Sequence, residues 1–239
     1  MALVETSIEY SVGEVRFEAF MAYDDTARGP RPGVLIAPTW AGRDRFACDK
    51  ARRLASLGYV GFAIDLYGQA QTGEGAEACT ALMTPLVNDR MLLKQRICAA
   101  LDCLKHQPSV DSSRIAAIGF CFGGLCVLDL ARSGADLRGV VSFHGLFSAP
   151  SPTLETSIKP KILVLHGFED PMATPQEALA LGEELTARNA DWQIHFYGRT
   201  QHAFTNPKAN DPSFGTVYNP SADERSWRSL MDFLEEVLK

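Results

Sequence analysis

The sequence predicts a single α/β domain, built on a mostly parallel central sheet with helices on both faces. Short runs rich in Val and Ile recur along the 239 residues, and segments with helical periodicity separate them. No charge block, repeat or low-complexity linker divides residues 1–239. Continuous apolar strands of this kind are buried on both faces, and strands that alternate with helices need crossover connections. A chain of this length can bury one sizeable core.

The predicted strands follow the apolar runs in order. Val15–Phe20 fits an N-terminal edge strand or hairpin, and Trp192–Tyr197 is expected to form a late strand. Between them lie five continuous apolar runs that predict buried strands: Gly33–Ala37, Val60–Ile64, Ile115–Ile118, Val140–Phe143 and Ile162–Leu165.

Helical periodicity and capping residues predict the helices. Asp44–Leu57 should form a helix that stops at Gly58, and Leu86–His106 a longer one. The small and polar residues of Gly68–Ala81 are typical of a long loop. Capping boxes mark the starts of two further helices, at Thr174–Glu177, with Pro175 at its first helical position, and at Ser221–Glu224.

Composition excludes several classes of function. The formal net charge of −6 argues against binding to the phosphate backbone of nucleic acids, which requires clustered Lys and Arg. No apolar run approaches the ~20 residues of a membrane span, and Met1–Tyr10 lacks the features of a signal peptide. We therefore expect a cytoplasmic protein whose six cysteines are free thiols.

A nucleophile turn is the strongest chemical signal in the sequence. The apolar strand Ile115–Ile118 leads directly into Gly119–Gly124, and a helical pattern resumes at Leu125–Arg132. The spacing G-x-C-x-G is that of a nucleophile elbow with Cys121 in the place of serine. The helix that follows favours the reactive thiolate, and the backbone N–H of Phe122 should point at an oxyanion.

An acid and a histidine follow at the ends of the next strands. Asp170 comes after the strand that ends at Leu165, and His202 comes after Trp192–Tyr197. Glu169 competes with Asp170 for the role of orienting acid. Nucleophile, acid and histidine in this order are typical of the α/β-hydrolase fold.

The second donor to the oxyanion is expected in the loop after Gly33–Ala37. We favour the backbone N–H of Trp40, because Pro38 has no N–H, while Thr39 and Ala41 remain alternatives. His144 ends the strand Val140–Phe143 on the active side of the sheet, where it could line the pocket.

The chain resembles the dienelactone hydrolase family from about Pro32 to Leu238. The resemblance rests on the Gly119–Gly124 turn, Asp65-Leu66-Tyr67 at a strand end, Asp170-Pro171 and His202-Ala203-Phe204. It implies the α/β-hydrolase fold and a carboxymethylenebutenolidase-like hydrolysis of lactones or esters. It also gives Cys121, Asp170 and His202 the family's triad roles, and Trp40 and Phe122 its oxyanion-hole roles.

Two residues depart from the family pattern. Thr39 stands where the best-known members have a glutamate that takes part in activating the thiol, and Asn206 stands where they have an arginine for a substrate carboxylate. Both positions are candidates for substrate contact. Unless another arginine replaces the missing one, neutral lactones or esters should be the better substrates. The candidates for that replacement are Arg43, Arg45, Arg90 and Arg199.

The sequence thus predicts a cysteine-dependent hydrolase of carboxylic esters or lactones that works through an acyl-enzyme and needs neither metal nor cofactor. Its partner should be a small ester or lactone, with no nucleic acid and no membrane, and the protein should be a monomer or weak homodimer. A thioesterase or acyl-protein esterase with the same triad is one alternative. A non-catalytic binding module on a hydrolase scaffold is another.

Overall fold

The computed structural model describes residues 2–26, 29–151 and 157–239 of the chain. Contacts within the chain separate two units, residues 1–117 and 118–239. The boundary falls inside strand β5 (Val110–Phe120). Each unit is described by itself below.

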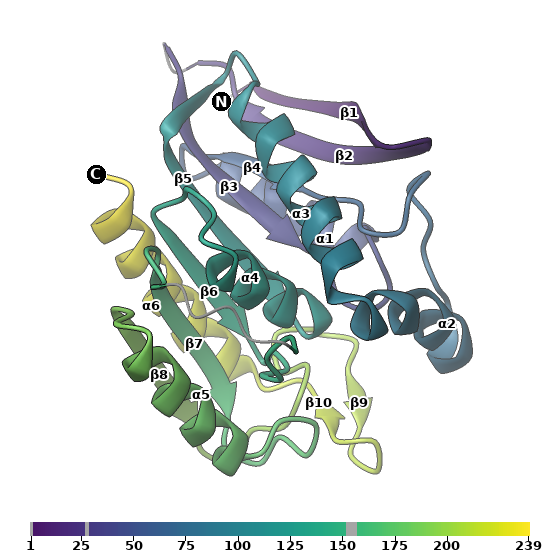
Figure 1. Cartoon of the computed structure of the whole chain (residues 1–239), viewed down its shortest axis with the longest axis vertical. Coiled ribbons are helices and arrows are strands. Elements are labelled where there is room, and N and C mark those ends of the chain that lie inside the picture. Colours follow the sequence, from purple (N-terminus) through teal and green to yellow (C-terminus); the bar gives the residue numbers. More distant parts are fainter. Residues whose placement is uncertain (1, 27–28, 152–156) are drawn as a thin grey trace. The chain divides into compact units, whose positions relative to one another are not determined.

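The sheet of the first unit begins with a hairpin. Strands β1 (Leu3–Val12) and β2 (Val15–Asp24) pair along their whole length in antiparallel register, which confirms the predicted hairpin. Strand β2 also pairs antiparallel with β4 (Val60–Ala63), and β4 pairs parallel with β3 (Arg31–Ala37). The strand order is therefore β1-β2-β4-β3 (Figure 1).

Helix α1 (Arg45–Ala55) begins and ends where the sequence indicates. The side chain of Asp44 caps its first turn by accepting the N–H of Ala47. At the other end Gly58 adopts a φ of +92°, and the N–H of Tyr59 donates to the carbonyl of Leu54. This pattern is the glycine-terminated helix end that was predicted.

The predicted loop and long helix between residues 68 and 106 are wrong in their boundaries. The segment instead forms α2 (Gly75–Asn88) and α3 (Arg90–Lys105), which meet at Asp89. The side chain of Asp89 accepts the N–H groups of Met91 and Leu92, so it starts a new helix. Sequence periodicity missed the break because the apolar stripe continues across it.

The sheet of the second unit contains the parallel strands β6 (Gly139–Phe143), β7 (Lys161–Gly167) and β8 (Trp192–Tyr197). The end of β5 lies beside β6, because the N–H of Cys121 donates to the carbonyl of Phe143. Helices α4 (Phe122–Arg132), α5 (Pro175–Ala187) and α6 (Pro220–Val237) pack on these strands, with α4 and α6 on opposite faces (Figure 1).

The starts of the last two long helices differ in how well the sequence anticipated them. The capping box at Thr174 and Glu177 is present, with Pro175 at the first position of α5. Helix α6 starts two residues earlier than predicted. Asn219 caps it and Pro220 takes its first position, so the box predicted at Ser221–Glu224 lies within its first turns.

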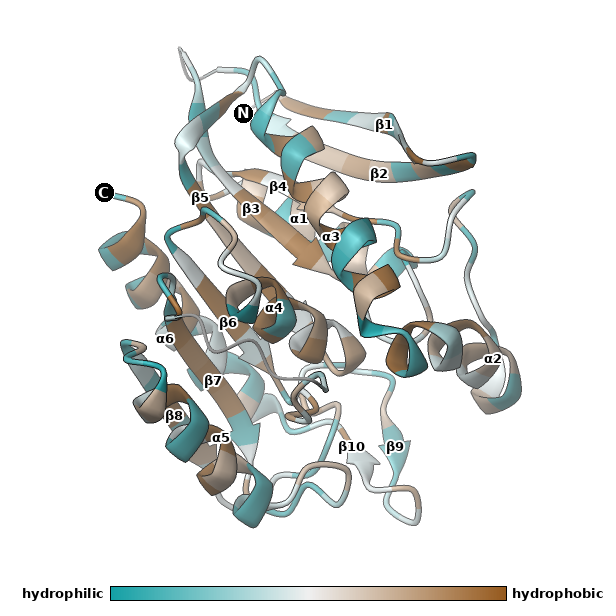
Figure 2. Cartoon of the chain, viewed as in Figure 1, coloured by the Kyte–Doolittle hydropathy of each residue, from teal (hydrophilic) through white to brown (hydrophobic). Residues whose placement is uncertain are grey.

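Burial explains the apolar runs. Every residue of β4 and β6 is buried, and Figure 2 shows hydrophobic residues along β3, β6 and β7. A strand covered on both faces has no solvent side, so its sequence does not alternate. Within the described ranges, no helix is both long and apolar enough to cross a bilayer.

Candidate active site

The nucleophile turn joins β5 to α4 at Cys121. The cysteine has a φ of 56° and a ψ of −118°, a combination that L-residues rarely adopt. Gly119 allows the turn to close, because a Cβ there would overlap the carbonyl of Gly123. The N–H of Gly124 donates to the carbonyl of Cys121 at 2.9 Å. The result is a partly exposed thiol at the start of a helix.

Helix α4 directs its positive end at the thiol. Phe122 is its first residue, so the N–H of Phe122 has no acceptor within the helix. The N–H groups of a first helical turn and the helix dipole stabilise negative charge at this end, which favours the thiolate form of a cysteine.

His202 and Asp170 form a buried hydrogen-bonded pair. Nδ1 of His202 donates to Oδ2 of Asp170 at 2.7 Å, and the two residues are 1% and 2% exposed. The other carboxylate oxygen accepts the N–H groups of Met172 and Ala173. This arrangement fixes the orientation of the imidazole, with Nδ1 bound to the carboxylate.

The loop after His202 holds this pair in a way that the sequence did not reveal. Its short strands β9 (Asn210–Asp211) and β10 (Thr216–Val217) pair antiparallel, and β10 bridges to His202. Gly215 accepts the N–H of His202 at 3.0 Å and leaves no room for a Cβ against Pro171. The loops that carry the acid and the histidine are thereby packed together. The requirement for glycine at position 215 is a sequence signal for this contact.

His166 supports the acid loop from the other side. Burial lowers the pKa of His166, so its imidazole is neutral, and Nε2 donates to the carbonyl of Ala173 at 2.7 Å. Because Ala173 also donates to Asp170, this bond fixes the turn that presents the carboxylate.

The electrostatics of the site favour a charged histidine. Burial by itself lowers the pKa of His202, but the negative charge of Cys121 and the hydrogen bond to Asp170 outweigh it and raise the pKa to about 10. Nε2 makes no hydrogen bond of ordinary geometry within the described chain. The thiol is near enough to raise the pKa of the ring through its negative charge.

This raised pKa predicts the alkaline limit of activity. Thiolate and imidazolium stabilise each other, so we expect kcat/KM to fall on the alkaline side only as the pH approaches about 10. The stability that the pair contributes is complete below the ordinary histidine pKa and is lost as pH rises through the folded value. The measurement is kcat/KM against pH for a substrate without ionisable groups. A fall centred near neutral pH would contradict the assignment.

The other predicted site residues are distributed over both units. Thr39 and Trp40 follow β3 in the first unit, where the Thr39 hydroxyl accepts the N–H of Ala41 and the Trp40 carbonyl accepts the hydroxyl of Tyr67. The oxyanion role of Trp40 and the pocket role of Thr39 stay predictions. In the second unit Glu169 is exposed, so Asp170 rather than Glu169 contacts His202.

His144 and Asn206 also belong to the second unit. His144 is buried beside the nucleophile turn, where its Nδ1 accepts the N–H of Cys121. The side-chain oxygen of Asn206 accepts the N–H of Lys208, which closes a local turn. Their roles as substrate contacts stay predictions.

The six cysteines are free thiols, as predicted. Cys48, Cys79 and Cys126 are buried, and Cys98 and Cys103 lie on α3. Among the residues that the structure describes, no group of His, Cys, Asp and Glu side chains could hold a metal ion.

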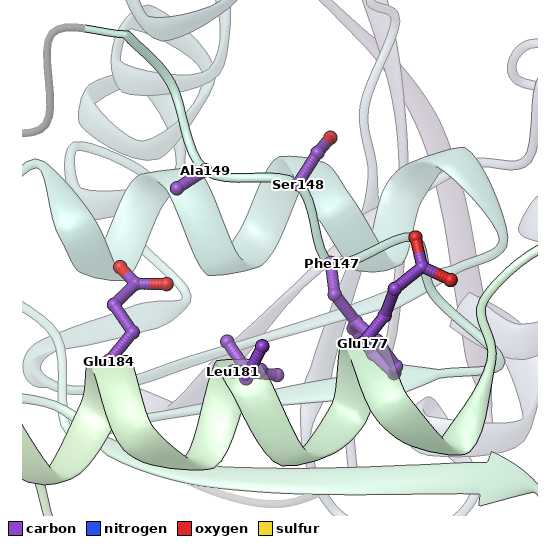
Figure 3. Close-up of a pocket in the computed structure, with 7 residues that line it drawn as sticks. Phe147, Ser148, Ala149, Glu177, Leu181 and Glu184 are labelled. Carbon is purple, nitrogen blue, oxygen red and sulfur yellow. The ribbon is translucent and has the colours of Figure 1, made fainter.

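A separate pocket of about 310 Å³ lies beside α5 (Figure 3). Phe147 and Leu181 are among its lining residues, and Glu177 and Glu184 flank it. Both carboxylates are engaged, since Glu177 caps α5 and Glu184 pairs with Arg132. No histidine or cysteine is among the lining residues, so we do not assign the pocket to catalysis.

Comparison with known proteins identifies the family of the chain. A model of the dienelactone hydrolase family matches residues 17–238. The chain belongs to the dienelactone hydrolase family. The chain is therefore a hydrolase with the α/β-hydrolase fold, as the sequence predicted.

Three relatives cover most or all of the chain. The solved structure named m3DLH is 38% identical over 100% of both chains, with a TM-score of 0.95. A dienelactone hydrolase-like promiscuous phosphotriesterase from metagenomic libraries is 36% identical over 100% of both chains, with a TM-score of 0.94. A probable 2-oxo-3-(5-oxofuran-2-ylidene)propanoate lactonase of Bradyrhizobium is 26% identical, over 86% of this chain and 84% of its own.

Proposed function

We propose that this protein hydrolyses carboxylic esters or lactones through a Cys121–His202–Asp170 triad and an acyl-enzyme. The observation that carries the proposal is a partly exposed cysteine on a strained turn, beside a histidine whose pKa is raised to about 10 and which is hydrogen-bonded to a buried carboxylate. This combination activates a nucleophile and has no evident structural benefit.

In the first half of the reaction the Cys121 thiolate attacks the carbonyl carbon. The N–H of Phe122, and in our proposal that of Trp40, stabilise the oxyanion. The His202 imidazolium then donates its Nε2 proton to the leaving alkoxide, and a thioester to Cys121 remains.

In the second half a water molecule attacks the carbonyl carbon of the thioester, the C–S bond breaks, and the carboxylic acid leaves with the Cys121 thiolate restored. Acylation removes the thiolate charge, one of the causes that raise the pKa of His202, so the pKa of the ring falls at this stage. Neutral imidazole is then available as the base that deprotonates the water. Asp170 orients the ring in both halves.

The surroundings of the candidate arginines bear on whether the substrate carries a charge. Arg43 is bound to Glu18 at 2.7 Å with its side chain 11% exposed, so its charge is already matched. Arg45 is 89% exposed, and Arg199 is also exposed. Arg43 is therefore not a ready replacement for the missing arginine at Asn206, while Arg45, Arg90 and Arg199 stay candidates that the substrate comparison below tests. We propose that the substrate is uncharged.

This inference predicts a preference between matched substrates. For pairs that differ only in a free carboxylate or its methyl ester, we expect a higher kcat/KM with the methyl ester, because a desolvated carboxylate would lack a cationic partner. Initial rates with both members of each pair give the ratio. A preference of about tenfold or more for the acid, about 1.4 kcal/mol in transition-state binding, would show that an arginine does reach the substrate.

A wider substrate panel separates the proposal from its alternatives. It compares lactones, aryl esters and acyl-thioesters, and a higher kcat/KM for thioesters would indicate a thioesterase or acyl-protein esterase. No turnover of any of them, together with a Cys121 that reacts with iodoacetamide no faster than a small thiol, would favour a binding module.

Phosphate triesters are a second candidate substrate class. The 36% identical relative over the whole chain is named as a promiscuous phosphotriesterase. The same thiolate could attack phosphorus and the same N–H groups could stabilise the oxyanion. An aryl phosphate triester therefore belongs in the panel, with activity counted only where it is lost together with Cys121.

The remaining parts of the proposal concern partners. We propose that the protein acts on a small molecule without metal or cofactor, since the triad supplies the nucleophile, base and acid that the hydrolysis requires. As a monomer or weak homodimer it would show a mass near 26.1 kDa, or twice that at high concentration, in a light-scattering measurement.

A further inference from the structure

His144 is a buried polar residue for which the triad mechanism has no role. It follows β6 with a φ of +37°, and its side chain is part of a residue only 1% exposed. Burial of a histidine costs free energy, because its ring nitrogens lose their hydrogen bonds to water. A bulky residue with a positive φ is also uncommon. Both costs must be offset by specific contacts.

Those contacts fix the protonation state of the ring. Nδ1 lies 3.2 Å from the backbone N of Cys121, whose N–H is also shared with the carbonyl of Phe143 at 3.0 Å. A backbone N–H can only donate, so Nδ1 carries no proton. The proton therefore sits on Nε2, which donates to Oγ1 of Thr205 at 2.8 Å.

The two hydrogen bonds connect the turn at Cys121 to the loop that carries His202. At one end is the nucleophile, and at the other is Thr205, a buried residue three positions after His202. The ring of His144 also lies edge-on to the ring of His202, with centroids 5.1 Å apart, and to Phe204 at the same distance. The bridge from Cys121 through His144 to Thr205 runs beside the base itself.

We propose that His144 is a positioning residue: as a neutral imidazole it ties the nucleophile turn to the loop that carries His202 and so sets the spacing between Cys121 and the base. The proposal rests on the proposed function of the triad. Neutrality is essential, because a protonated Nδ1 would face the N–H of Cys121 donor to donor and would place a second positive charge beside His202.

The expected kinetic signature follows from this role. Proton transfer between Cys121 and His202 depends steeply on their separation, whereas substrate affinity does not. Loss of the bridge should therefore lower kcat and leave KM nearly unchanged. A residue that contacts substrate would instead change KM, and by amounts that differ between substrates.

The sharpest test removes one end of the bridge and leaves His144 and its backbone intact. Thr205→Val keeps the side-chain shape and deletes the acceptor, and we expect kcat on an aryl ester to fall about tenfold with KM within about threefold. Ser226→Ala is the matched control, since it deletes a buried hydroxyl on α6 that donates to the carbonyl of Asp223. Its kcat should stay within about twofold of the parent value.

Substitution of His144 provides the second arm. His144→Phe keeps a ring and removes both hydrogen bonds, and His144→Asn keeps an acceptor near the position of Nδ1. We expect a fall in kcat of about thirtyfold or more for Phe and a partial recovery for Asn. Because both substitutions act on one bridge, Thr205→Val should cost little further in the His144→Phe background.

The outcomes are distinct. A kcat within about twofold of the parent for Thr205→Val, or an effect confined to KM, would overturn the positioning role. The Thr205→Val result remains decisive even if the His144→Phe variant fails to fold, because Thr205→Val leaves His144 unchanged. An active Cys121→Ala variant would overturn the proposed function itself, whereas an inactive one beside a fully active Thr205→Val overturns only the role of His144.

Discussion

Cys121→Ala is expected to lower kcat for ester hydrolysis by at least about a thousandfold, because it removes the nucleophile and with it the acyl-enzyme route. The fold should survive, since the thiol makes no capping bond to α4 and alanine needs less space on the turn. The measurement is kcat on an aryl ester together with the thermal unfolding midpoint. Mass spectrometry of the parent after a brief reaction should show the acyl group on Cys121.

Cys98→Ala is the matched control for this experiment. Cys98 is, like Cys121, a partly exposed cysteine, but it lies within helix α3 and has no part in the proposed triad. Its kcat should remain within about twofold of the parent value. If Cys121→Ala kept more than about a tenth of the activity after removal of host esterases, the cysteine mechanism would be wrong.

Asp170→Asn is expected to give the second-largest loss, roughly a thousandfold in kcat with KM little changed. The amide cannot stabilise the imidazolium, and its N–H₂ group would face the Nδ1–H of His202 where a carboxylate oxygen now accepts it at 2.7 Å. The hydrogen bond to Asp170 is also one of the causes that raise the pKa of His202. The thiolate should therefore be scarcer, and alkylation of Cys121 by iodoacetamide at neutral pH should slow.

Glu169→Gln separates this effect from a general change of charge in the same loop. Glu169 is the preceding residue, carries the same charge and is exposed, whereas Asp170 is buried. Its replacement should leave kcat within about threefold of the parent value. A reversal of the two results would make Glu169 the orienting acid.

Some of the candidate site could be predicted from the sequence because its signals are local. The turn at Cys121 needs small residues at fixed spacing, and Gly119 and Gly123 provide them within five positions. The order of nucleophile, acid and histidine follows from the order of the strands, whose ends lie on one edge of a parallel sheet. The oxyanion role of Trp40 stays a prediction, and so does the organisation of residues 1–239 as a single domain.

Other parts depend on residues far apart in the chain. The sequence favoured Asp170 but left Glu169 as a competitor, because the folded loop decides which of two adjacent carboxylates turns inward. It placed His144 at a strand end but could not show the bond to Thr205, which is 61 positions away. The packing of Gly215 against Pro171 was equally hidden.

By itself, then, the sequence determined the α/β class, the buried strands, the nucleophile turn and the family, because periodicity, capping and turn chemistry act over a few residues. The tertiary structure decided which carboxylate meets His202, where α2 separates from α3 and how His144 is held. The physical reason is that burial removes water from these polar groups, and only the complete fold determines which partner replaces it.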